Sequence, residues 1–164
     1  MMKAVWSGVA AVALVLGAST SVFAQATANG AIGVTANVAA KAKLTLGTAA
    51  IAFADADPDT TPVMTATAVD IDVKARTSGA VTLTVLATGD LVSGSNTIGI
   101  SNLTWAATGS GFQAGTSNKT VAQTVGAWAG SGSPIGTQTY SLPNSWTYAT
   151  GTYTVTLNYT LTAP

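Results

Sequence analysis

The sequence predicts an all-β protein whose short antiparallel strands, about seven to nine of them, pack as a sandwich or a barrel. Short runs of β-branched residues alternate along the chain with Gly, Asn, Pro and Ser, which favour turns. Helix-favouring Glu is absent, and the only segment with a clear helical pattern is the N-terminus. These features together indicate one β domain behind an N-terminal helix.

The expected strands follow from the β-branched runs and the turn residues that bound them. They are Ile32–Val38, Lys43–Leu46, Ala50–Phe53, Ala68–Ala75, Ala80–Ala87, Asn102–Ala107, Thr120–Val125, Thr137–Leu142 and Tyr153–Leu161.

Two of these strands alternate most clearly, as antiparallel strands with one buried face do. In Tyr153–Leu161 the apolar residues share one face, and Thr and Asn share the other. In Ala68–Ala75 and the residue after it, the charged residues share one face; they are Asp70, Asp72, Lys74 and Arg76. We interpret this as a solvated face with cross-strand charge pairs; an acidic binding site and protection of a sheet edge are the alternatives.

The N-terminus has the layout of a secretory signal peptide. Lys3 supplies a positive charge, an apolar run follows, and small residues lead to a predicted cleavage site after Ala24. The apolar run is about 14 residues long, shorter than the roughly 20 that span a bilayer as an anchor. We expect a signal peptide over 1–24, a single domain over 25–164 without a transmembrane segment, and an extracytoplasmic location: periplasm, cell surface or medium.

Composition excludes several classes of function. Only 7% of the residues are charged, against about 25% in ordinary domains, and there is no His, Cys or Glu. The near-neutral balance gives no electrostatic footprint for nucleic acid. His- and Cys-dependent catalytic constellations are impossible, so we expect no enzyme. A surface with so little charge favours self-association.

One acidic cluster could bind a cation. Asp55, Asp57 and Asp59 occupy alternate positions around Pro58, and carboxylate oxygens are calcium ligands. The cluster fails the EF-hand pattern, because Thr60 and Ala66 stand where Gly and Glu are needed. The two interpretations are an exposed acidic turn, with no cofactor, and a calcium-stabilised loop.

The aromatic residues offer a second kind of site, a platform on which sugars could stack. They are Trp105, Trp128, Trp146, Tyr140, Tyr148, Tyr153 and Tyr159. The alternative is that they pack in the core and on the sheet faces.

The chain resembles the bacterial secreted β-sandwich group that includes spore coat protein U-like and fimbrial-subunit-like domains. The resemblance rests on the signal peptide, an early strand pair ending in Ile51-Ala-Phe53, and the terminal run Gly151–Leu161. It implies an immunoglobulin-like sandwich that serves as a surface or fibre subunit, and assembly by donation of a strand to a neighbour.

The residues after the cleavage site fit that role, because exposed sheet edges accept another strand. Ile32, Val34, Ala36 and Val38 alternate with small or polar residues behind a short tail. This segment could pair with a neighbouring subunit or fold back as the first strand of its own sheet. We therefore expect an exported structural subunit that associates with itself or another surface protein; the alternative is a secreted carbohydrate- or partner-binding module.

Overall fold

The computed structural model describes residues 27–164, so the predicted signal peptide over 1–24 lies outside the described residues. The described chain falls into two units. Residues 27–36 belong to the first, and Asn37–Pro164 form the second, which contains all the strands. No helix within residues 27–164 is long and apolar enough to cross a membrane.

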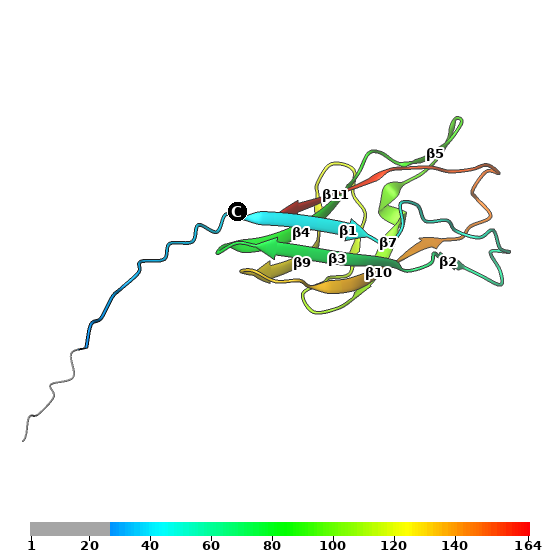
Figure 1. Cartoon of the computed structure of the whole chain (residues 1–164). Helices are drawn as coiled ribbons and strands as arrows, with labels where there is room; N and C mark the ends of the chain where they lie inside the picture. Colours follow the sequence, from blue (N-terminus) through cyan, green and yellow to red (C-terminus); the bar gives the residue numbers. More distant parts are fainter. Residues whose placement is uncertain (1–26) are drawn as a thin grey trace, which may run out of the picture. The chain divides into compact units, whose positions relative to one another are not determined.

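The prediction of an all-β fold with antiparallel sheets is confirmed (Figure 1). The strands are β1 Lys41–Leu46, β2 Val63–Thr65, β3 Val69–Arg76, β4 Ala80–Ala87, β5 Leu91–Ser93, β6 Asn96–Ile98, β7 Thr104–Thr108, β8 Gly115–Thr116, β9 Gln123–Ala129, β10 Ile135–Pro143 and β11 Leu157–Thr162. A single 3-10 turn, η1, covers Ile100–Asn102.

The strands form two main sheets and a small hairpin. The larger sheet has the order β1-β3-β10-β7-β8, with β2 also paired to β10, and the smaller sheet has the order β11-β4-β9. β5 and β6 form the separate hairpin. β1 and β11 are therefore edge strands, each belonging to a different sheet.

Both sheets contribute to one hydrophobic core, because their central strands alternate strictly. In β3 the side chains of Val69, Ile71 and Val73 are buried, and the residues between them face outward. β4 and β10 bury every second residue in the same way. The fully buried side chains of the two sheets belong to the same core cluster, so the sheets are held together by apolar contact.

A buried polar contact also joins the sheets. The Tyr159 hydroxyl in β11 donates a hydrogen bond to Gln138 Oε1 in β10 at 2.5 Å, so the Tyr140 hydroxyl must be the donor in its 2.6 Å contact with Tyr159. Burial raises the pKa of both tyrosines, which keeps them neutral and able to donate.

The two sides of the core are closed differently. On the β8 side, the loop after β7 bonds to β9: Gln113 N–H donates to the Val125 carbonyl at 2.8 Å, and Ala127 N–H donates to the Gly111 carbonyl at 3.0 Å. On the other side, β1 and β11 approach each other as edge strands of separate sheets (Figure 1).

Most of the predicted strands are found, with shifted ends. Ala80–Ala87 coincides with β4, and the predicted strands at Lys43, Ala68, Asn102, Thr120, Thr137 and Tyr153 correspond to β1, β3, β7, β9, β10 and β11. The expected count of about seven to nine strands was too low for the described chain. The missed strands β2, β5, β6 and β8 are only two or three residues long, so no alternation is visible in them.

Two predicted strands were wrong. Ala50–Phe53 is extended but pairs with no strand among the described residues, although Ile51 and Phe53 pack against the core. Ile32–Val38 forms no strand within residues 27–164, and its side chains are exposed. Both segments have the alternating pattern of a strand, but a strand also requires a partner.

We predict that burial in the core determines how much a side chain contributes to stability. Val85 is 1% exposed and Val121 is 59% exposed. Val85→Ala should lower the free energy of unfolding by about 2 kcal/mol, and the matched Val121→Ala by less than about 0.5 kcal/mol. Urea denaturation of residues 25–164 measures both, and equal losses would contradict the assigned core.

Candidate functional site

The seam between β1 and β11 is the principal candidate site. The two strands approach each other, but each is the outermost strand of its own sheet. The outer side of an edge strand presents backbone N–H and C=O groups that another strand can bind. The seam therefore lies between two backbones able to pair with an additional strand.

The apolar side chains along the seam are only partly covered. On one side they are Leu44 and Leu46 of β1 with Ile51 and Phe53 of the next segment; on the other they are Tyr153, Val155, Leu157, Tyr159 and Leu161. All of these are half-buried, whereas the inward-facing residues of β4, the strand next to β11, are fully buried; they are Val81, Leu83, Val85 and Ala87. The core is thus incompletely covered along this seam, as it would be if one strand were missing.

Residues 51–55, which follow β1 in the chain, also pack against the core without joining a sheet. Ile51 and Phe53 face the core and Ala52 and Ala54 are exposed, which is the alternation of a strand. Among the described residues, no backbone–backbone hydrogen bond involves 51–55. This segment is therefore a further stretch of unpaired backbone next to the core.

The predicted assembly strand, Ile32–Val38, is exposed along its length. Ile32 is 91% exposed, Val34 is 88% exposed and Val38 is 64% exposed, and Ala36 is exposed as well. In an extended conformation these seven residues would span about 23 Å, comparable to the six residues of β11. The segment has the apolar pattern and the length of a strand, but no strand pairs with it within residues 27–164.

The predicted calcium residues form a turn. Asp57 Oδ1 accepts a hydrogen bond from the Asp59 N–H at 2.9 Å, and the Asp57 carbonyl accepts one from the Thr61 N–H at 2.8 Å. The three carboxyl groups of Asp55, Asp57 and Asp59 are exposed, and no metal-holding group of three or more acidic, His or Cys residues occurs in the described chain. The exposed-turn interpretation fits this geometry, and calcium binding stays a prediction.

The charged face of β3 continues onto β1. Lys41 lies directly opposite Arg76, and Lys43 directly opposite Lys74, so four cations share the outer face of the larger sheet. On this face Lys74 also forms an ion pair with Asp72 of the same strand, at 3.5 Å between Nζ and Oδ2. The cross-strand charge pairs expected on this face were wrong for β1 and β3, because the directly opposed charges are alike. The alternative that these charges protect an edge was also wrong, because β1 and β10 flank β3. The sequence alone could not place Lys41 and Lys43 on this charged face, because their position depends on the register between β1 and β3.

Most of the predicted aromatic platform is core. Trp105 and Tyr140 are 2% and 1% exposed, and the other members except Trp146 are half-buried. Trp146 is 69% exposed, and its indole N–H donates a hydrogen bond to Asp59 Oδ1 at 3.1 Å. Among the described residues this is the one aromatic side chain that presents most of its surface to solvent.

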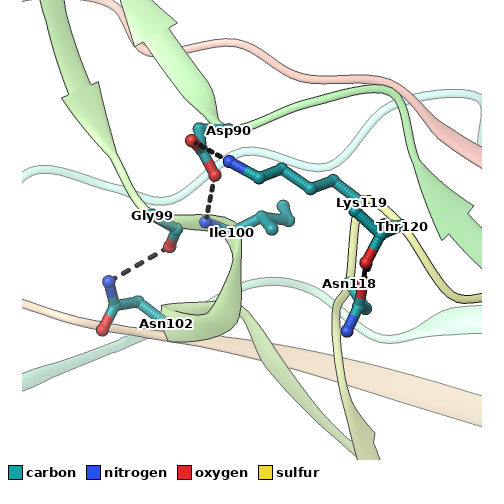
Figure 2. A network of polar contacts seen from close by, with 7 residues as sticks. All are labelled: Asp90, Gly99, Ile100, Asn102, Asn118, Lys119 and Thr120. Carbon is teal, nitrogen blue, oxygen red and sulfur yellow. Dashed lines mark hydrogen bonds and ion pairs between the residues drawn. The ribbon is translucent and has the colours of Figure 1, made fainter.

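A polar network near the β5–β6 hairpin fixes the loops around η1 (Figure 2). Asp90 accepts a hydrogen bond from Lys119 Nζ at 2.6 Å and another from the Ile100 N–H at 3.0 Å. The bond from Lys119 and the one from Ile100 lower the pKa of Asp90 below its ordinary value of 3.8. Sequence reasoning missed this pair because its members lie 29 residues apart.

The chain matches no protein-family model, and comparison with the curated proteins and with the solved structures finds no significant similarity.

We predict that the Asp90 network stabilises the fold in a pH-dependent way. Because the folded-state pKa of Asp90 is lowered, its contribution is present above its ordinary pKa and is lost as pH falls through the folded-state value. The difference in urea midpoint between the protein and Asp90→Asn should be largest near about pH 6 and shrink towards about pH 2. A pH-independent difference would show that the charge of Asp90 is not what matters.

Proposed function

We propose that this protein is an exported structural subunit that assembles through strand edges, with Ile32–Val38 of one copy binding along the β1/β11 seam of another. One observation carries the proposal: the same chain has an exposed apolar strand-length segment and a half-covered core between two unpaired strand edges. Either feature alone is a liability in water, and each supplies what the other lacks.

The chemistry of the two surfaces is complementary. Ile32, Val34 and Val38 would gain about 2 kcal/mol each on moving from water into an apolar seam. The backbone of the segment would bond to an exposed edge, as in other cases of strand addition. Gly33 and Thr35 would then face outward, where small or polar side chains suit solvent.

The proposal extends to the architecture and the location of the protein. We infer that the two sheets form an immunoglobulin-like sandwich from which one edge position is missing, and that residues 1–24 are a signal peptide cleaved on export. The resemblance to spore coat protein U-like and fimbrial-subunit-like domains supports the same structural role. The absence of His and Cys from the chain supports a function without enzymatic chemistry.

We predict that deleting Ile32–Val38 from the mature chain abolishes assembly without destabilising the subunit. The segment is exposed and unpaired in the described structure, so its removal costs the isolated fold nothing. Light scattering and negative-stain microscopy measure assembly, and circular dichroism measures the thermal midpoint. Replacing Val34 alone with Asp, which retains the length of the tail, should also block assembly.

A peptide of residues 32–38 provides the complementary experiment. Added in excess to the deletion variant, it should raise the thermal midpoint, because a ligand that binds only the folded state stabilises it. The Val34→Asp peptide is the matched control. Filaments that form without residues 32–38 would refute the proposed site. A thermal midpoint of the deletion variant that does not change on addition of the peptide would refute it as well.

A second candidate function is supported by Trp146. Its exposed ring is held by the hydrogen bond to Asp59, and the adjoining Asp57 and Ser145 supply polar groups suited to a saccharide. Binding on a glycan array that disappears in Trp146→Ala but persists in the tail deletion would favour this recognition module. Equal array signals from the protein and Trp146→Ala would argue against it.

A further inference from the structure

We propose that the basic outer face of β1 and β3 docks against the Asp55–Asp59 turn of a second copy, so that subunits join head to tail by opposite charge. This inference rests on the proposed function and adds a second contact and a direction to it. It starts from the register of β1 and β3, not from the seam.

The register places like charges together. Lys41 lies opposite Arg76, and Lys43 lies opposite Lys74, on the same outer face. Directly opposed like charges destabilise an antiparallel pair. Four of the five cations in residues 27–164 are gathered here, in a chain with few charges of any kind. A bound anionic group would relieve this repulsion.

The carboxylates of the same chain, including Asp70 and Asp72 on this face, neutralise the basic face only in part. Lys74 pairs with Asp72, and the fifth cation, Lys119, pairs with Asp90. Within the described residues, Lys41, Lys43 and Arg76 form no ion pair, and the Arg76 Nε–H donates to the backbone carbonyl of Ala39. Three cations are therefore available to an anionic partner.

The matching anions lie at the opposite end of the same sheet. Arg76 ends β3 beside the start of β1, whereas the Asp55–Asp59 turn lies beyond the far end of β10. There, the side-chain amide of Asn144 donates to the Ala56 carbonyl at 2.9 Å, and Trp146 bonds to Asp59. The three carboxyl groups are exposed, so a second copy can reach them.

In the proposed assembly, chain connectivity brings the basic face of the donor close to the acidic turn of the acceptor. Only two residues separate Val38 from Lys41, so the basic face of the donor lies within about 11 Å of the end of the donated strand. On the acceptor, Asp55 is the last residue of the unpaired 51–55 segment, whose Ile51 and Phe53 pack against the core. A strand that leaves the seam at this end sets the donor cations beside the acceptor carboxylates.

Charge therefore selects one direction of insertion. β1 runs towards the acidic end of the sheet, and β11 runs away from it, as the shared pairing of β4 and the position of Pro164 beside Thr77 require. A donated strand whose Val38 lies at the acidic end runs antiparallel to β11. The reverse direction would place the basic face of the donor against the basic face of the acceptor.

The test compares variants of matched net charge in mature protein. Lys41→Gln with Lys43→Gln should slow assembly about tenfold at about 20 mM sodium chloride, and by less than about twofold at about 500 mM, where charges are screened. The control, Thr124→Glu with Ala127→Glu on the outer face of β9, changes the net charge equally but leaves the basic face intact. The thermal midpoint of the Lys variant should be unchanged or raised.

A charge swap makes the test specific. Lys41→Asp with Lys43→Asp should block assembly at low salt, and adding Asp55→Lys with Asp57→Lys in the same chain should restore it. Assembly that requires the tail but ignores these substitutions and salt would overturn the docking contact and leave the proposed function standing. A protein that stays monomeric under all conditions would overturn both.

Discussion

The contact between the inner faces of β3, β10 and β4 is the constraint on which the rest of the structure depends. The chain has no cysteine, so no disulfide can hold the sheets together. Their alignment comes from alternating apolar side chains and from the buried Gln138–Tyr140–Tyr159 contact, which permits one arrangement of polar partners. That alignment brings β1 and β11 beside each other as the edges of different sheets.

The core is incompletely covered on one side of the molecule. Its apolar rows continue to the β1/β11 seam, where they are only half covered, although the opposite side is closed by backbone bonds to β9. The chain also carries an exposed segment of matching pattern immediately before β1. Apolar surface and strand edges both require partners, and this principle underlies the proposal that the subunit completes its fold through a neighbour.

The sequence predicted the fold correctly where the alternation within one segment is enough to identify a strand. The strict alternation of Val69–Arg76 and Ala80–Ala87 predicted β3 and β4, because burial of one face is the only stable use of such a pattern. The sequence was insufficient where strand formation depends on pairing with another segment. Ala50–Phe53 and Ile32–Val38 have the pattern of strands but form none within residues 27–164. The seam, the β1–β3 charge register and the Asp90–Lys119 pair join residues distant in sequence, which no local pattern specifies.

The most direct test of the central claim is amide hydrogen exchange on residues 25–164, measured residue by residue in the monomer and in the assembled state. The claim requires that residues 32–38 exchange freely in the monomer and become protected on assembly, together with the outward-facing amides of β11 and of residues 51–55. Strand pairing at the seam predicts that all three change together. Assemblies in which residues 32–38 remain unprotected, or in which β11 is unchanged, would contradict it.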